Sequence, residues 1–138
     1  MRRKSAVVAS VASDSHTWNL VFLQLVLEEL GCDVVNLGAA PPDDFLTAEC
    51  ARIAPDLVVI SSVNGHGYQD GLRVAGQLRS HLAHASIVIG GKLGISGDLS
   101  PAEVSSLIEA GFDAVFDDSA ELAAFTSFVC GLPVRVAS

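Results

Sequence analysis

The chain has 138 residues, enough for one ordinary domain with a buried core and too few for a second core of comparable size, so we expect a single domain over residues 1–138. Half of the residues are hydrophobic and only 17% are charged, which favours a subunit that meets a partner or a large ligand. The formal net charge of -8 disfavours nucleic-acid binding, because that depends on basic patches.

The cysteines and the hydropathy pattern bear on the compartment. Cys32, Cys50 and Cys130 are odd in number, widely spaced and lack a Cys-x-x-Cys motif, so they indicate neither a disulfide framework nor a zinc site. A reducing cytoplasm fits this usage. No apolar run approaches the roughly 18 to 20 residues that a membrane span needs, so we expect no membrane association.

The chain alternates strand-like and helix-like segments. Residues 5–12 are apolar without alternation, which is typical of a strand covered on both faces. Residues 18–30 follow, a helix so apolar that we expect most of its circumference to be covered. In chain order, the further strands are expected at 33–37, 57–62, 86–89 and 114–116, and the further helices at 42–53, 70–84, 101–110 and 119–129.

Five strand–helix units with short connections predict an α/β fold with helices on both faces of a parallel sheet. We expect the flavodoxin-like, doubly wound arrangement of five strands in the order 2-1-3-4-5. In such sheets, ligands bind outside the carboxyl ends of the strands. The serines and glycines gather in the segments that follow the first four strands, at 13–16, 38–42, 61–67 and 90–97, and these segments predict one large edge site.

The loop after the first strand carries the clearest chemical signal. Asp14 precedes His16 by two residues, and a metal-ligating histidine commonly donates its other ring N–H to a carboxylate. A lone loop histidine is more often structural, but the paired carboxylate and the position favour a ligand. His66 has no such partner in its loop, and we interpret it as a polar residue of a cofactor or partner loop. His81 and His84, three residues apart, indicate an exposed helix face rather than a metal site.

Residues 14–19 resemble the Asp-x-His-x-x-Gly motif of cobalamin-binding domains. Ser61-Ser62 and Gly90-Gly91 are similar to the second and third motifs of that family, at similar spacing. The resemblance extends across almost the whole chain and is greatest to the small (sigma) subunits of glutamate mutases, also called methylaspartate mutases. Because the motif begins after only 13 residues, a stand-alone subunit fits better than a methyltransferase module with a preceding helical domain.

The resemblance implies a role for each matching residue. His16 would be the axial ligand of the cobalt, and Asp14 would fix its tautomer. Ser61 would meet the buried base of the nucleotide tail. The chain departs from the motif at Asn19, where the family has glycine, and this places a side chain near the tail. The implied cofactor-binding residues are Ser13, Asp14, Ser15, His16, Thr17, Asn19, Ser61, Ser62, Val63, Gly65, Gly90, Gly91, Lys92, Leu93, Gly94, Ile95 and Ser96.

The resemblance further implies adenosylcobalamin as cofactor and an isomerase that interconverts L-glutamate and threo-3-methyl-L-aspartate by radical rearrangement. Beyond cofactor ligation, this subunit would supply no catalytic residue. A larger barrel-shaped subunit would bind the substrate, in a heterotetramer. The alternatives are a cobalamin-binding regulatory module, a methyl-transferring corrinoid protein and a cofactor-free interaction domain. A phospho-receiver is disfavoured, because Ser61 and Ser62 stand where receivers carry their acceptor aspartate.

Overall fold

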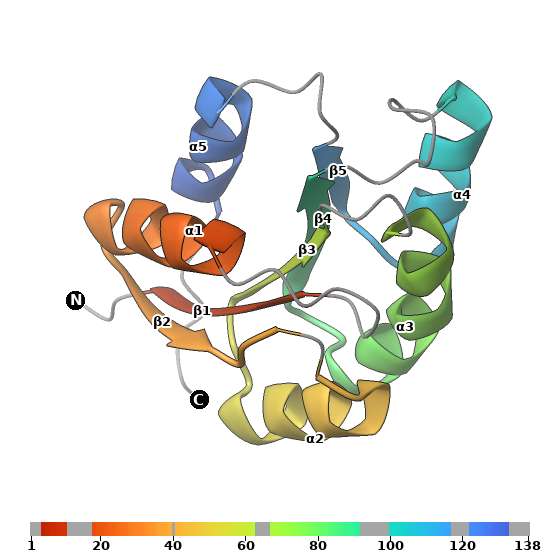
Figure 1. The fold of residues 1–138 in the computed structure, drawn as a ribbon, viewed down its shortest axis with the longest axis horizontal. Coiled ribbons are helices and arrows are strands. Elements are labelled where there is room, and N and C mark those ends of the chain that lie inside the picture. Colours follow the sequence, from red (N-terminus) through yellow and green to blue (C-terminus); the bar gives the residue numbers. More distant parts are fainter. Residues whose placement is uncertain are drawn as a thin grey trace.

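The computed structural model describes residues 4–10, 18–39, 41–62, 67–91, 100–116 and 122–132. Five parallel strands form one sheet in the order β2-β1-β3-β4-β5, which confirms the predicted flavodoxin-like fold (Figure 1). Its elements are β1 (Lys4–Ser10), α1 (Trp18–Glu29), β2 (Cys32–Asn36), α2 (Asp43–Ile53), β3 (Leu57–Ser62), α3 (Gly67–His81), β4 (Ser86–Gly91), α4 (Pro101–Ala110), β5 (Ala114–Phe116) and α5 (Leu122–Cys130). No helix within these ranges is long and apolar enough to cross a membrane.

The sheet is apolar on both faces because helices cover both. Residues 6–9 of β1 are fully buried, as their unbroken apolar run predicts. Val7 and Ala9 belong to the core under α2, α3 and α4, while Ala6 and Val8 belong to the core shared with α1 and α5. The alternation of a strand thus divides one short sequence between two hydrophobic cores.

The predicted boundaries differ most from the structure at both ends of α3 and at the end of β4. Helix α3 covers Gly67–His81 rather than 70–84, so it begins and ends three residues early. Strand β4 continues through Gly90 and Gly91, which the sequence pattern assigns to a loop because glycine has a low strand propensity. Helix α4, by contrast, begins where predicted. Pro101 follows the N-cap Ser100, and Ser100 and Glu103 form a reciprocal capping box.

Side chains bind backbone groups at the amino ends of the strands. The buried Asp56 accepts a hydrogen bond from the Ser5 amide at 2.8 Å, and Asp113 accepts one from the Ile87 amide at 2.8 Å. All five N–H donors of Arg79 are used: they reach the carbonyl oxygens of 82, 85 and 111 and the carboxylate of Asp113. These contacts join the end of α3 to the strands that follow it.

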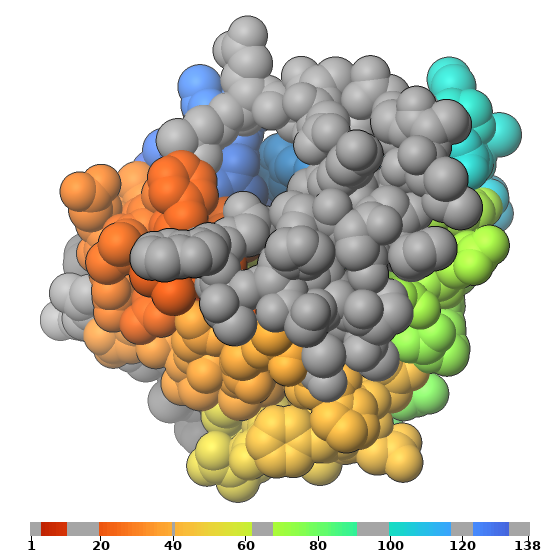
Figure 2. All heavy atoms as spheres, viewed as in Figure 1, coloured from red at the N-terminus to blue at the C-terminus, as the bar shows by residue number. Residues whose placement is uncertain are grey.

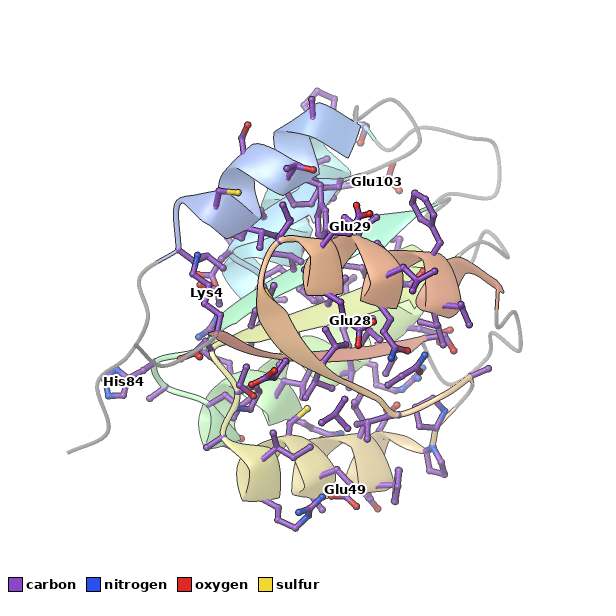
Figure 3. All side chains as sticks on the ribbon, turned by 90° about the vertical axis from the view of Figure 1, so that its left-hand side faces the viewer. Lys4, Glu28, Glu29, Glu49, His84 and Glu103 are labelled. Atoms are coloured by element: carbon purple, nitrogen blue, oxygen red, sulfur yellow. The ribbon has the colours of Figure 1, made fainter. Side chains whose placement is uncertain are left out.

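Helix α5 contacts the sheet through a hydrogen bond from β1 and through aromatic contacts with β5. Lys4 lies beneath its last turn and donates to the Val129 carbonyl at 2.9 Å, a favourable position for a cation at a helix carboxyl end (Figure 3). The Phe116 ring of β5 meets Phe125 and Phe128 edge to face, with ring centroids 5.5 and 5.8 Å apart.

Candidate functional site

Small residues meet in register at the carboxyl ends of the inner strands. Ser10 of β1 pairs with Ser61 of β3, Ser61 pairs with Gly90 of β4, and Gly90 pairs with Phe116 of β5. Ser10 and Ser61 are only 2% and 3% exposed. Ser10, Ser61 and Gly90 are uncharged and have little side-chain volume. They can therefore border a large, neutral ligand at the edge where doubly wound sheets bind ligands.

The structure brings part of the predicted site together. Ser61 and Ser62 lie beside Gly90 and Gly91 in the paired ends of β3 and β4, and Asn19 lies in the first turn of α1. The remaining predicted site residues lie outside the described ranges: Ser13, Asp14, Ser15, His16, Thr17, Val63, Gly65, Lys92, Leu93, Gly94, Ile95 and Ser96. Their assignment therefore stays a prediction.

Gly90 has a packing role of its own. A Cβ atom at this position would lie 3.0 Å from the Phe116 carbonyl oxygen and 3.5 Å from the Phe116 Cβ. A side chain there would press on the backbone of β5, so close pairing of β4 and β5 already favours glycine. The sequence offers only the ligand-based explanation, because the register of β5 is not visible in it.

A polar turn completes the described edge beyond β2. Asn36 accepts a hydrogen bond from the Gly38 amide at 2.8 Å and donates to Gln24 of α1 at 3.2 Å. Gly38 has a φ of +88°, a conformation that favours glycine. The turn thereby fixes the start of the β2–α2 connection against α1. Sequence reasoning overlooked Ser10 and Asn36, because they lie inside the segments 5–12 and 33–37 that the pattern assigns to strands.

An ion-pair cluster joins the first turns of α2 and α3 on the other face. Arg73 donates to Asp43 at 2.6 Å and to Asp70 at 2.7 Å, and Asp70 is buried. The hydrogen bonds that the Arg73 guanidinium donates to Asp43, and to a smaller degree those to Asp70, raise its pKa above the usual range. Sequence reasoning missed this cluster, because Asp43 and Arg73 are 30 residues apart. It holds together the helix starts that flank the β3 end of the site.

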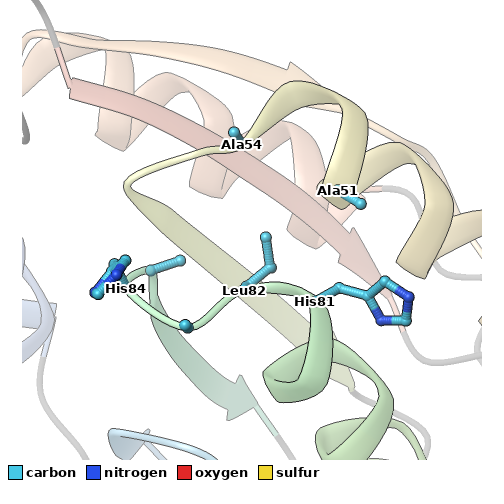
Figure 4. A pocket seen from close by; sticks show the side chains of 7 residues that line it. Ala51, Ala54, His81, Leu82 and His84 are labelled. Atoms are coloured by element: carbon cyan, nitrogen blue, oxygen red, sulfur yellow. The ribbon is translucent and has the colours of Figure 1, made fainter. Parts of the chain in front are cut away.

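A hollow of about 230 Å³ lies at the opposite, amino end of the sheet, between the ends of α2 and α3. Its lining includes Ala51, Leu82, His81 and His84, and Figure 4 shows the two imidazoles pointing in opposite directions. Both histidines are exposed, as predicted, although His84 lies beyond the end of α3 rather than on it. Among the described residues, no group of three or more histidine, cysteine or acidic side chains is placed to hold a metal ion.

The fold has counterparts among solved structures. A cobalamin-binding protein from Desulfitobacterium hafniense superposes with a TM-score of 0.70 at 18% identity. The match covers 92% of this chain, which spans only 58% of that protein. At this identity the likeness shows the fold alone, and it agrees with the five-stranded parallel sheet described above.

Sequence relatives are more informative about the family. A glutamate mutase sigma subunit of Fusobacterium nucleatum is 31% identical over 118 residues, which are 84% of this chain and 86% of the relative. A glutamate mutase sigma subunit of Halobacterium salinarum is 34% identical over 81% of this chain and 75% of the relative. The B12 binding domain family matches residues 4–124, from the first residue of β1 into α5. The chain is therefore a member of the B12-binding domain family.

Proposed function

We propose that the chain is the cobalamin-binding small subunit of an adenosylcobalamin-dependent carbon-skeleton mutase of the glutamate mutase type. The observation that carries this proposal is the family match over residues 4–124, together with relatives of comparable length that are named glutamate mutase sigma subunits. Those names refer to one subunit of an enzyme, so a separate catalytic subunit belongs to the proposal.

The described edge fits the proposed cofactor. The ends of β1, β3 and β4 present Ser10, Ser61 and Gly90, which are small, and Ser10 and Ser61 are buried. A flat heterocyclic base with a ribose needs such short hydroxyl groups and close backbone approach rather than charged side chains. On the same face, Leu20 of α1 and Phe125 of α5 belong to one apolar core, which suits a large uncharged ligand portion.

The proposed division of roles follows the motif residues. His16 would bind the cobalt through one ring nitrogen, and Asp14 would accept a hydrogen bond from the N–H of the other nitrogen and so orient the ring. Ser61 would meet the base of the tail, with Ser62 and Val63 beside it. Residues 90–96 would surround the ribose and phosphate portion. The other predicted residues would complete the surface around the cofactor: Ser13, Ser15, Thr17, Asn19 and Gly65.

When bound, adenosylcobalamin supplies an organic radical, which is the chemistry that a carbon-skeleton rearrangement requires. The chain's own contribution is to bind and orient the cofactor. Substrate would be held by the larger, barrel-shaped subunit in a heterotetramer, and the proposed reaction interconverts L-glutamate and threo-3-methyl-L-aspartate.

Cobalamin added to the purified chain tests the binding role. We expect the absorption spectrum of a base-off, histidine-ligated corrinoid with the wild type and its loss in His16→Ala. His81→Ala is the matched control, because His81 is exposed at the far end of α3 and should leave the spectrum unchanged. A free-cobalamin spectrum with the wild type at saturating protein contradicts the proposal.

A second experiment tests the reaction. The chain and a candidate large subunit from the same genome are purified together and given L-glutamate and adenosylcobalamin, with methylaspartate as the measured product. Product that requires both subunits supports the named reaction. A stable, cobalamin-loaded complex without product contradicts the substrate and leaves the cofactor role standing.

A further inference from the structure

The outward face of α1 is apolar over its first turns. Val21, Phe22 and Leu25 are 42%, 49% and 58% exposed, while Leu20 and Leu27 of the same helix are buried against the sheet. Residues three and four positions apart are neighbours on a helix, so the three exposed side chains form one stripe. We call Val21, Phe22 and Leu25 the α1 stripe.

The stripe departs from the expectation that most of α1 would be covered. Helix α1 packs on β1 and β2, and Figure 1 shows it at the side of the fold with no described element beyond it. Figure 2 shows orange atoms of this part of the chain at the surface of the molecule. A surface helix normally turns charged or polar residues outward, and a helix that is apolar all round is typical of a buried one. The apolar outer side of α1 is therefore better explained by contact with another molecule than by exposure to solvent.

The location and charge of the stripe indicate what covers it. Helix α1 starts at the carboxyl edge of the sheet, so the stripe adjoins the proposed cofactor site, while Glu28 and Glu29 stand exposed at its far end (Figure 3). Asp33, the second residue of β2, is also exposed. Residues 18–36 contain no lysine or arginine. An apolar surface with a basic rim is therefore the complementary partner.

We infer that the α1 stripe docks the larger mutase subunit, through an apolar patch bordered by lysine or arginine side chains. This inference rests on the proposed function and adds a second contact to the cofactor itself. A subunit that caps the carboxyl edge reaches the first turns of α1, and it meets Glu28 and Glu29 where it extends along the helix. A second copy of this chain fits less well, because its own α1 offers only acidic groups to Glu28 and Glu29.

Binding of the purified chain to the candidate large subunit, with adenosylcobalamin present, tests the docking surface. We expect Leu25→Glu to weaken the dissociation constant at least about tenfold, because a charge would be buried in an apolar contact. The matched control is Ile108→Glu, since Ile108 is 47% exposed on α4, across the sheet from α1. It should change the constant less than about twofold.

A charge-reversal pair tests the rim. Glu28→Lys with Glu29→Lys should weaken binding and reverse its dependence on salt, because attraction to a basic rim becomes repulsion. Glu109→Lys on α4 is the control and should leave binding unchanged, since Glu109 is exposed away from α1. A complex that tightens on reversal of Glu28 and Glu29 overturns the basic rim.

The outcomes separate the two proposals. Each variant is first tested alone for the histidine-ligated cobalamin spectrum, which a folded Leu25→Glu chain should keep. Equal effects of Leu25→Glu and Ile108→Glu on complex formation overturn the docking surface only. A wild-type dimer that Leu25→Glu dissociates also overturns it, in favour of a second copy. A wild-type chain without any cobalamin spectrum contradicts the proposed function instead.

Discussion

Two glycines inside α3 differ in their surroundings and allow a paired test of the core. A Cβ at Gly71 would lie 2.7 Å from Ile89 Cδ1, 3.3 Å from Leu107 Cδ2 and 3.4 Å from Phe112 Cε2, whereas at Gly76 it would meet nothing within 4 Å. The contacting side chains are almost completely buried, so they have little room to move. Helix α3 therefore approaches β4 closely at Gly71 and not at Gly76.

The expected free energies follow from two opposing terms. Alanine in place of glycine favours a helix interior by about 0.8 kcal/mol at either position. Overpacking at Gly71 costs about 2 kcal/mol, so Gly71→Ala should lower the free energy of unfolding by about 1 kcal/mol. Gly76→Ala should raise it by about 0.8 kcal/mol. The two variants should thus differ by roughly 2 kcal/mol.

Urea unfolding followed by circular dichroism measures this difference. With a slope of about 2 kcal/mol per molar urea, the midpoints should lie about 1 M apart, with Gly71→Ala the lower. Equal slopes in the two variants would show that the change lies in stability. A Gly71→Ala midpoint at or above that of Gly76→Ala would refute the close approach of α3 and β4.

The remaining predictions concern Arg79 and the cysteines. Arg79→Met should lower the free energy of unfolding by about 3 kcal/mol in the same urea assay, because Arg79 makes five hydrogen bonds. The control Arg52→Met removes an exposed ion pair and should change this free energy by less than about 0.5 kcal/mol. Equal losses in the two variants would contradict a stabilising role of the Arg79 hydrogen bonds. Burial, with a smaller effect of nearby acid, raises the pKa of the Cys50 thiol from 9.0 to about 12. The folded chain thus holds that proton more tightly than the unfolded chain, so stability should fall as pH rises from 9 toward 12, and Cys50→Ala should flatten this dependence. At pH 8, a thiol reagent should modify the exposed Cys130 and leave Cys50 intact, and rapid modification of Cys50 would contradict its burial.

The parallel sheet with helices on both faces was predictable because its inner strands are apolar runs, which are typical of a sheet covered on both faces. The end of α3 was not predictable from local signals. No glycine or proline lies between His81 and β4, and the chain leaves the helix where Arg79 donates to the carbonyl oxygens of Leu82 and Ala85. That contact depends on tertiary structure, and it outweighs the helical pattern of residues 82–84.

The candidate site was predictable in part. Ser61 and Gly90 were identified from motif and spacing, and the ends of β3 and β4 bring them side by side. The adjacency of Ser10 to Ser61 follows from strand register, which depends on the whole sheet and not on any one segment. The exposure of Phe22 and Leu25 was not predicted for a similar reason. The apolar composition of a helix indicates that it is covered, but not whether the same chain or another molecule covers it.

The hydrogen bonds of Asp56, Arg79 and Asp113 have a consequence for the order of events in assembly. They secure the amino ends of β1 and β4 with groups that belong to the chain itself. The small residues Ser61 and Gly90 stand at the opposite ends of the strands. In the proposed function the cofactor binds at the carboxyl ends of the strands, whereas these hydrogen bonds stabilise the amino ends. We therefore expect the chain to fold before it binds cobalamin.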